Sequence, residues 1–138
     1  MRIALAALAL SAAVASPALA GDPTGLWQTP TNGGQVRISR CGQALCGALI
    51  TSDHIRADPN RRDVHNRDAA QRNRTLRNLP LLNGFTGGPA EWRGGTVYNP
   101  EDGRTYSGSI RLTDDNTLHL QGCVVRPLCR TQTWTRIR

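Results

Sequence analysis

The sequence lacks the motifs by which several common enzyme classes are recognised. It has no Gly-x-Ser-x-Gly nucleophile motif, no His-Glu-x-x-His zinc motif and no glycine-rich phosphate loop. The adjacent carboxylates Glu101 and Asp102 lie in a Pro-Glu-Asp-Gly stretch, which is typical of a turn, and no partner base is indicated. His54 and His65 occur among aspartates, but their spacing matches neither a zinc motif nor a calcium loop. We therefore predict no catalytic site, no metal site and no cofactor.

Long apolar runs are confined to the start of the chain. Residues 1–2 carry a positive charge, residues 3–15 form an apolar core, and residues 18–20 (Ala-Leu-Ala) fit the small-x-small cleavage rule of secretory signal peptides. The apolar core is too short to span a membrane as a helix. We therefore expect cleavage before Gly21, export to the periplasm or the extracellular space, no transmembrane segment, and a single domain over residues 21–138.

Lysine is absent, so the positive charge comes entirely from arginine. The chain has seventeen arginines against ten acids, and without Arg2 sixteen arginines against ten acids leave a net charge of +6. A basic balance can indicate nucleic acid, but an exported protein rarely meets any, and we expect no such partner. Anionic lipid head groups or envelope polysaccharides are then the expected counter-ions. The alternative is an arginine-rich surface that only keeps the protein soluble.

Beyond the leader, short Thr- and Val-rich segments alternate with clusters of Gly, Pro, Asn and Asp, which is typical of an all-β protein. The expected strands cover residues 25–29, 35–40, 46–51, 80–85, 91–98, 104–113, 118–121 and 130–137. The clearest alternation is in residues 104–113; in residues 91–98, Trp92, Gly94, Thr96 and Tyr98 should share one face. Both terminal segments are good strands and can pair. We therefore predict a small eight-stranded antiparallel up-and-down barrel rather than a flattened sandwich.

A long insertion interrupts this rhythm between the third and fourth strands, over residues 52–81. It is rich in Arg, Asp and Asn, and Asp68 and Gln71 have the spacing of a helix start, so we expect a short helix over residues 69–75. Loops of this length in compact domains are usually lids, binding loops or disordered segments. The insertion is therefore the first place to look for function.

A simple meander separates two ends of the barrel. One end, which we call the closed end, should be plugged by three tryptophans and an arginine stacked on the first of them: Trp27, Trp92, Trp134 and Arg136. The opposite end, the mouth, carries the insertion and should hold a ligand beneath it. The expected ligand contacts there are Tyr98, Arg104, Tyr106, Phe85 and His54.

The four cysteines form two close pairs, neither with the Cys-x-x-Cys spacing of zinc ribbons or thioredoxin-like sites. An even count in an exported chain indicates disulfides, and four cysteines allow three pairings. In the meander, one pair flanks a turn at the closed end and the other flanks a loop at the mouth. Because bonded cysteines have Cα atoms only about 4.4–6.8 Å apart, we predict Cys41–Cys46 and Cys123–Cys129.

Several stretches resemble a known family. They are Gly25-Leu26-Trp27, Cys-Gly-x-x-Leu-Cys-Gly at residues 41–47, Tyr-Asn-Pro-Glu-Asp-Gly-Arg-Thr-Tyr-Ser at residues 98–107, and Arg-Thr-Gln-Thr-Trp-Thr-Arg at residues 130–136. This order is similar to that of the bacterial exported domain-of-unknown-function family 2147. The resemblance implies an exported, lipocalin-like β-barrel of the calycin type. Gly25-x-Trp27 is also similar to the start of lipocalins, where an arginine of the last strand packs on the tryptophan; Arg136 would take that place.

Three functional hypotheses follow. The first is a monomeric periplasmic carrier that holds a small apolar or amphipathic ligand under the insertion. The second is an envelope interaction protein that uses its arginine surface on anionic lipid or polysaccharide, and the third, weaker than both, is an enzyme acting at the mouth.

Overall fold

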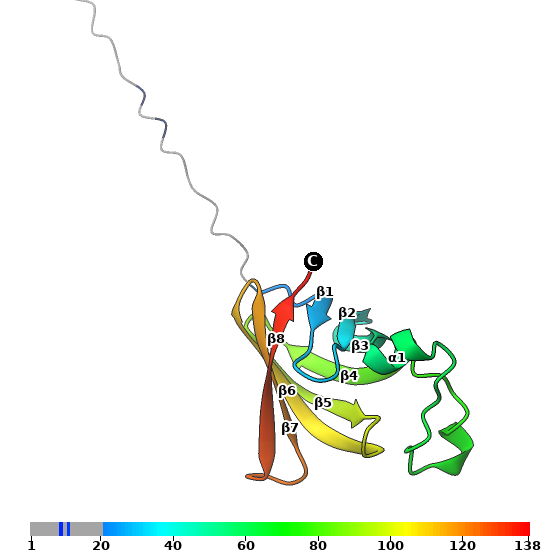
Figure 1. Cartoon of the computed structure of the whole chain (residues 1–138). Helices are drawn as coiled ribbons and strands as arrows, with labels where there is room; N and C mark the ends of the chain where they lie inside the picture. Colours follow the sequence, from blue (N-terminus) through cyan, green and yellow to red (C-terminus); the bar gives the residue numbers. More distant parts are fainter. Residues whose placement is uncertain (1–8, 10, 12–20) are drawn as a thin grey trace, which may run out of the picture.

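Eight antiparallel strands form a closed up-and-down barrel in the computed structural model, which describes residues 9, 11 and 21–138 (Figure 1). The strands pair in chain order, and β1 pairs with β8 to close the barrel. Their bounds are β1 Gly25–Gln28, β2 Gln35–Cys41, β3 Ala44–Thr51, β4 Leu79–Gly87, β5 Glu91–Asn99, β6 Arg104–Asp114, β7 Thr117–Cys123 and β8 Cys129–Arg136. The predicted fold class is confirmed. The predicted leader lies, apart from residues 9 and 11, outside the described residues and stays a prediction.

The seam between β1 and β8 is short. Only Trp27↔Arg136 and Gln28↔Thr135 pair across it. Three further backbone bonds extend the seam past the strand ends: the N–H of Leu26 donates to the carbonyl of Arg138 at 2.8 Å, and the carbonyl of Leu26 accepts from the N–H groups of Ile137 at 2.8 Å and Arg138 at 3.3 Å. Closure satisfies backbone groups that an open sheet would leave as a free edge.

A β-bulge in β5 changes which residues face the interior. Trp92 pairs with Ile110 of β6, but Gly95 pairs with Gly108, so β5 contains one extra residue between these points. Gly94 adopts a φ of +73°, which glycine reaches at little cost. After the bulge Gly95 is buried and Thr96 is exposed. The expected shared face of Trp92, Gly94 and Thr96 is therefore wrong beyond Trp92.

The insertion between β3 and β4 covers residues 52–78 and contains two short helical segments. The α-helix α1, Asp53–Ala57, begins at Ser52, whose hydroxyl accepts a hydrogen bond from the N–H of Ile55 at 3.3 Å. The 3-10 helix η1 covers only Ala69–Gln71, so the helix expected over residues 69–75 is much shorter than predicted. Asp68 does cap this turn, since its carboxylate accepts from the N–H of Ala70 at 3.0 Å.

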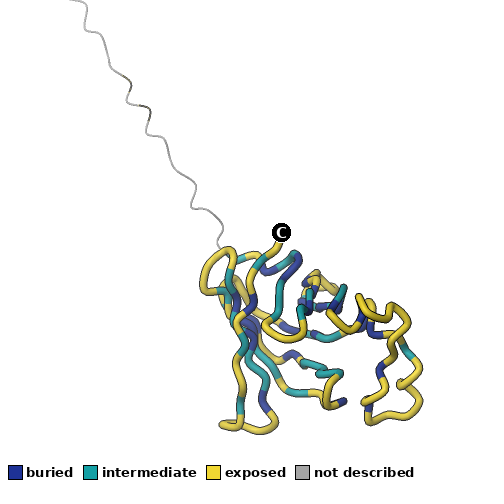
Figure 2. The backbone as a smooth tube through the Cα atoms, viewed as in Figure 1, coloured by how far each residue is buried: buried dark blue, intermediate teal, exposed yellow. Residues whose placement is uncertain are grey.

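The apolar core extends from Trp27 and Trp92 at the closed end to Ile55 and Leu76 of the insertion. Phe85 of β4 is fully buried, and a Cβ added at Gly95 would lie only 2.4 Å from its ring. The absence of a side chain at Gly95 therefore makes room for the Phe85 ring. Figure 2 shows that buried positions alternate with exposed ones along the strands, whereas the loops are mostly exposed.

Candidate ligand cavity

The barrel contains a cavity of about 890 Å³, open to solvent at the mouth, that extends from Trp134 to the loops of the mouth. This volume lies within the range of small-molecule sites, roughly 300–1,000 Å³. Its inner wall is apolar and is formed by Val36, Leu49, Leu76, Leu82, Val97, Leu120 and Trp134. Four loops surround its opening: the β1–β2 turn, the insertion, the β5–β6 turn and the β7–β8 loop. The arrangement suits a molecule with an apolar body and a polar end.

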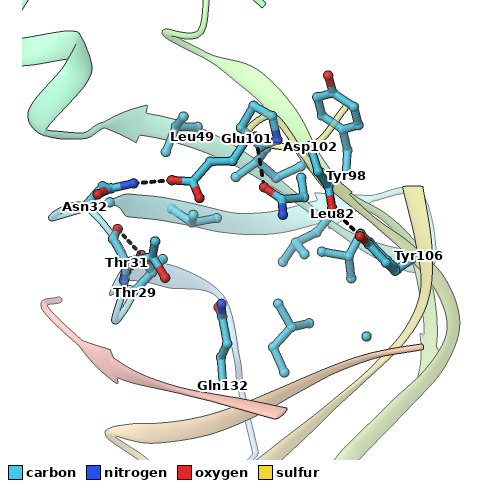
Figure 3. A pocket seen from close by; sticks show the side chains of 18 of the residues that line it. Thr29, Thr31, Asn32, Leu49, Leu82, Tyr98, Glu101, Asp102, Tyr106 and Gln132 are labelled. Atoms are coloured by element: carbon cyan, nitrogen blue, oxygen red, sulfur yellow. Dashed lines mark hydrogen bonds between the residues drawn. The ribbon is translucent and has the colours of Figure 1, made fainter. Parts of the chain in front are cut away.

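One side-chain amide lies on the otherwise apolar inner wall. The side-chain oxygen of Gln132 in β8 accepts a hydrogen bond from the indole Nε1 of Trp134 at 3.0 Å, so this oxygen points toward Trp134. Figure 3 shows the Gln132 side chain directed into the pocket. Its amide nitrogen is thus a hydrogen-bond donor available for a polar group deep in the cavity.

The closed end is sealed by Trp27 and Arg136. The guanidinium of Arg136 lies 4.4 Å from the Trp27 ring centroid, and the Trp27 indole donates to the carbonyl of Pro23 at 2.8 Å. Arg136 also donates to the carbonyls of Asp115, Thr24 and Asp22, each at 2.6 Å. These bonds join the segment before β1, the β6–β7 turn and β8 at one point.

The three tryptophans expected at the closed end divide between two roles. Trp27 and Trp92 are buried in the core and do not line the cavity, whereas Trp134 is buried and forms part of the cavity wall. Trp92 packs beneath the β4–β5 turn, where a Cβ on Gly88 would lie 3.2 Å from its ring. Trp134 therefore combines a place in the core with a surface that a ligand would touch.

The residues expected to contact a ligand are not all brought together. His54, Tyr98 and Tyr106 line the cavity near the mouth. Phe85 is fully buried in the core and is not part of the cavity wall, because Gly95 leaves space for its ring inside the barrel. Arg104 lies in a separate groove between the insertion and the outward faces of β4 and β5. Phe85 and Arg104 are therefore not cavity contacts, and the aliphatic residues of the inner wall are the contacts that the prediction missed.

A buried carboxylate ties the insertion to the barrel. The side chain of Asp63 has no exposed surface, and its oxygens accept from the hydroxyl of Tyr98 at 2.6 Å, from Nε of Arg74 at 3.0 Å and from the amide of Asn66 at 2.9 Å. The Arg74 guanidinium also lies 5.2 Å from the Tyr98 ring centroid. We call these four residues the Asp63 cluster. The hydrogen bonds that the other three residues donate offset the free energy that burial of the Asp63 carboxylate would otherwise cost.

Burial and the Asp63 cluster together raise the pKa of Tyr98. Desolvation by burial, followed by the hydrogen bond and negative charge of Asp63, raises the pKa of Tyr98 to about 12. The phenol therefore keeps its proton to a higher pH than an ordinary tyrosine, and it donates to Asp63. Tyr98 thus acts first as an anchor for the insertion, and only its remaining surface faces the cavity.

A second set of contacts joins the loops of the mouth to one another. Asn32 of the β1–β2 turn donates through its side chain to Glu101 (Figure 3). The backbone carbonyl of Asn32 accepts from the N–H of Asp53 at 2.9 Å. The Tyr106 hydroxyl donates to Asp102. Gly103 has a φ of +71°, and a Cβ there would lie 1.8 Å from the carbonyl oxygen of His65. Only glycine allows the β5–β6 turn to approach the insertion this closely.

The charged groups at the opening are predominantly basic. Arg61, Arg62 and Arg130 are exposed and line the cavity opening. The two acidic residues there, Glu101 and Asp102, accept hydrogen bonds from Asn32 and Tyr106 as described above. Within the described residues, no group of three His, Cys, Asp or Glu side chains is placed to hold a metal ion.

Both predicted disulfides are present. Cys41–Cys46 joins the ends of the β2–β3 turn at the closed end, and Cys123–Cys129 joins the ends of the β7–β8 loop at the mouth. Their Cα atoms are 5.8 Å and 4.0 Å apart, respectively. The second disulfide therefore lies at the base of a loop that lines the cavity.

Comparisons with known proteins agree with this fold. No curated protein matches the sequence. Among solved structures, a protein from the human pathogen Helicobacter pylori that belongs to the lipocalin family superposes with a TM-score of 0.77 and 20% sequence identity, over 86% of this chain and 84% of that chain. Identity at this level shows the fold alone. The family model described as "Uncharacterized protein conserved in bacteria (DUF2147)" matches residues 25–136, and the chain therefore belongs to the DUF2147 family.

Proposed function

We propose that this protein is an exported carrier that binds a small apolar or amphipathic molecule in its barrel, and that it acts by binding rather than by catalysis. The observation that carries the proposal is the cavity of about 890 Å³, which has a largely aliphatic inner wall and polar side chains at Gln132, Thr29, Ser52 and Tyr106 and around the opening. Burying an acyl chain or a similar apolar body against such a wall is favourable by roughly 25 cal/mol for each Å² removed from water.

The polar groups at the two ends of the cavity suggest how an amphipathic ligand lies. Its apolar body would contact Leu82, Val97 and Leu120, and its polar end would reach the opening beside Arg61 and Arg130. A negatively charged head group suits these arginines best. The carboxylates of Glu101 and Asp102 serve the loop contacts described above, which favours binding over acid–base chemistry at this position.

Export is supported by the leader pattern and the disulfides. Disulfides form and persist in oxidising compartments such as the periplasm, and the described residues contain no free cysteine. Within the described part of the chain, no helix is long and apolar enough to cross a membrane. Expression of the full chain in a bacterial host, followed by mass spectrometry of the periplasmic protein, should give a first residue of Gly21.

The binding proposal is tested by filling the cavity. Gly122 of β7 lines the cavity with an ordinary backbone conformation, and a Cβ there would lie 3.6 Å from the Cβ of Tyr106. Gly122→Leu should therefore occupy the cavity without disturbing the backbone. The matched control is Gln121→Leu, at the adjacent position on the opposite face of the strand.

The measurement is a thermal and chemical unfolding assay of delipidated protein with a long-chain fatty acid as the probe. At a probe concentration about one hundred times Kd, the free energy of unfolding should rise by about 2.7 kcal/mol. This gain should disappear in Gly122→Leu and persist in Gln121→Leu. Mass spectrometry of organic extracts from periplasmic protein should likewise find a co-purifying amphiphile in the control only. Equal gains in the two variants would place the ligand outside the cavity.

A further inference from the structure

The β7–β8 loop carries apolar side chains into solvent at the mouth. Val124, Val125 and Leu128 are 61%, 61% and 66% exposed. Figure 1 shows this loop at the bottom of the barrel, at the opposite end from the C-terminus, and Figure 2 shows it exposed. Val124 and Leu128 also line the cavity opening, together with Val64 of the insertion, which is 55% exposed. A cluster of large exposed apolar side chains indicates an interaction surface.

The loop is held in a defined shape. The Cys123–Cys129 disulfide closes it, the N–H of Val124 donates to the carbonyl of Leu128 at 3.1 Å, and the N–H of Leu128 donates to the carbonyl of Val125 at 2.6 Å. Because the loop is pre-organised, presenting its apolar side chains to a partner costs little conformational entropy.

Arginines accompany these apolar side chains. Arg61 and Arg62 of the insertion and Arg130 at the start of β8 are exposed and line the same opening. Apolar side chains that are bordered by cations are characteristic of surfaces that bind at the interface of an anionic bilayer. A second copy of the chain fits less well, because two such surfaces would bring arginines of like charge together.

From this geometry we infer that the rim of the cavity is a docking surface for an anionic lipid bilayer. Val124, Val125 and Leu128 enter the interfacial region of the bilayer, while Arg61, Arg62 and Arg130 contact lipid phosphates. The cavity then opens toward the membrane, and an amphipathic molecule can move between bilayer and barrel without crossing water. Docking requires no particular occupant of the cavity, so it can succeed or fail independently of the carrier proposal.

For the experiment, the full chain is expressed, and the protein is purified from the periplasm and delipidated. Its binding to lipid vesicles is then measured by co-sedimentation. Vesicles containing phosphatidylglycerol should bind the protein, and vesicles of phosphatidylcholine alone should bind it at least tenfold more weakly. Raising the salt concentration from about 0.1 M to about 1 M should weaken binding, because the Debye length falls from about 10 Å to about 3 Å.

Two variants and two matched controls separate the apolar and the electrostatic contributions. Val125→Asp should weaken binding about tenfold, because a charge replaces an apolar contact at the interface. Replacing Arg61, Arg62 and Arg130 by Gln should weaken it about one hundredfold, at about fivefold for each arginine. The control for the apolar variant is Ile137→Asp; Ile137 lies beyond β8 at the closed end and is 43% exposed. The control for the arginine variant replaces the exposed Arg37, Arg40 and Arg111 by Gln.

Several outcomes would overturn the inference. They are equal binding to both kinds of vesicle, absence of binding to phosphatidylglycerol, or losses in the control variants as large as those in the rim variants. A concentration-dependent dimer that Val125→Asp abolishes, without vesicle binding, would assign the surface to self-association instead. Circular dichroism of every variant checks that the barrel is intact, and repeating the assay with Gly122→Leu shows whether docking survives when the cavity is filled.

Discussion

The two ends of this barrel are built by different means. At the closed end, aromatic rings and one arginine pack directly against the sheet, with Arg136 4.4 Å from the Trp27 ring centroid. At the mouth, hydrogen bonds join the insertion, the β1–β2 turn and the β5–β6 turn, and the buried Asp63 ties the insertion to β5. The closed end therefore depends mainly on apolar packing, and the mouth depends on polar contacts that must all be satisfied together.

This difference suits a carrier. Packing at the closed end gives the barrel its stability, because buried aromatic groups contribute several kcal/mol each. Polar loop contacts are individually worth only about 1 kcal/mol. The mouth can therefore open locally while the strands remain paired, and elements that move for ligand entry are commonly drawn from such low-stability regions.

The largest effect should come from Trp27→Ala at the closed end. Truncation of a fully buried tryptophan removes its packing and leaves Arg136 without its aromatic partner, so the free energy of unfolding should fall by about 3–5 kcal/mol. Urea unfolding followed by circular dichroism measures the loss, and Trp27→Phe should lose less. If Trp27→Ala unfolded like the wild type but no longer bound a ligand, the two ends of the barrel would have to be exchanged.

At the mouth, Asp63→Ala should destabilise the insertion more than the barrel. Removing the carboxylate leaves Arg74 and Tyr98 without their acceptor in a buried site, and we expect a loss of about 2 kcal/mol. Hydrogen exchange should accelerate in residues 61–76 while β6 and β7 keep their protection. Asp58→Ala, at an exposed aspartate in the same insertion, is the control and should leave exchange almost unchanged. Uniform acceleration across the barrel would show that the two ends are not independent.

The closed end could be predicted from the sequence because its residues lie on periodic strands that a simple meander places side by side. The alternation of β6, the pairing of the terminal segments and the placing of Arg136 beside Trp27 follow from a period of two and a simple meander. The same meander predicts Cys41–Cys46 and Cys123–Cys129 among the three possible pairings, and both disulfides are present. In β5 the predicted faces are wrong, because the bulge at Gly94 adds one residue and inverts the faces that follow.

The mouth could be predicted much less well because its contacts are made by loop residues, which follow no period. Asp63 looked like one of several loop aspartates, yet its partner Tyr98 lies 35 residues later. Helix α1 begins at Ser52 without the acidic or amide residue three positions later that marks a capping box. Phe85 was expected at the mouth because nothing in its own segment reveals the space that Gly95 leaves for its ring.

The two disulfides allow the closed end and the mouth to be compared by the same kind of substitution. Each closes a loop with a sequence separation of five or six residues, so replacing either pair by serine should lower stability by about 2 kcal/mol. Their functional effects should differ. Loss of Cys123–Cys129 should loosen the β7–β8 loop and weaken vesicle binding, whereas loss of Cys41–Cys46 should not. Equal effects on vesicle binding would show that the disulfide acts through global stability alone.

The smallest expected effect concerns the ionisation of Tyr98. Its pKa is raised from 10.0 to about 12 because burial and Asp63 favour the neutral phenol in the folded state. The stabilisation is therefore fully present below pH 10 and is lost as the pH rises toward 12.

Ultraviolet absorbance of phenolate should show that Tyr98 titrates above the ordinary range, and Tyr98→Phe should remove that titration step with a loss of about 1 kcal/mol. In Asp63→Asn the same step should move to lower pH, because the negative charge that opposes phenolate formation is gone. If Tyr98 titrated near 10 in the wild type, its hydroxyl would be in contact with solvent, and the mouth would be held by the loop contacts of Asn32 and Gly103 instead.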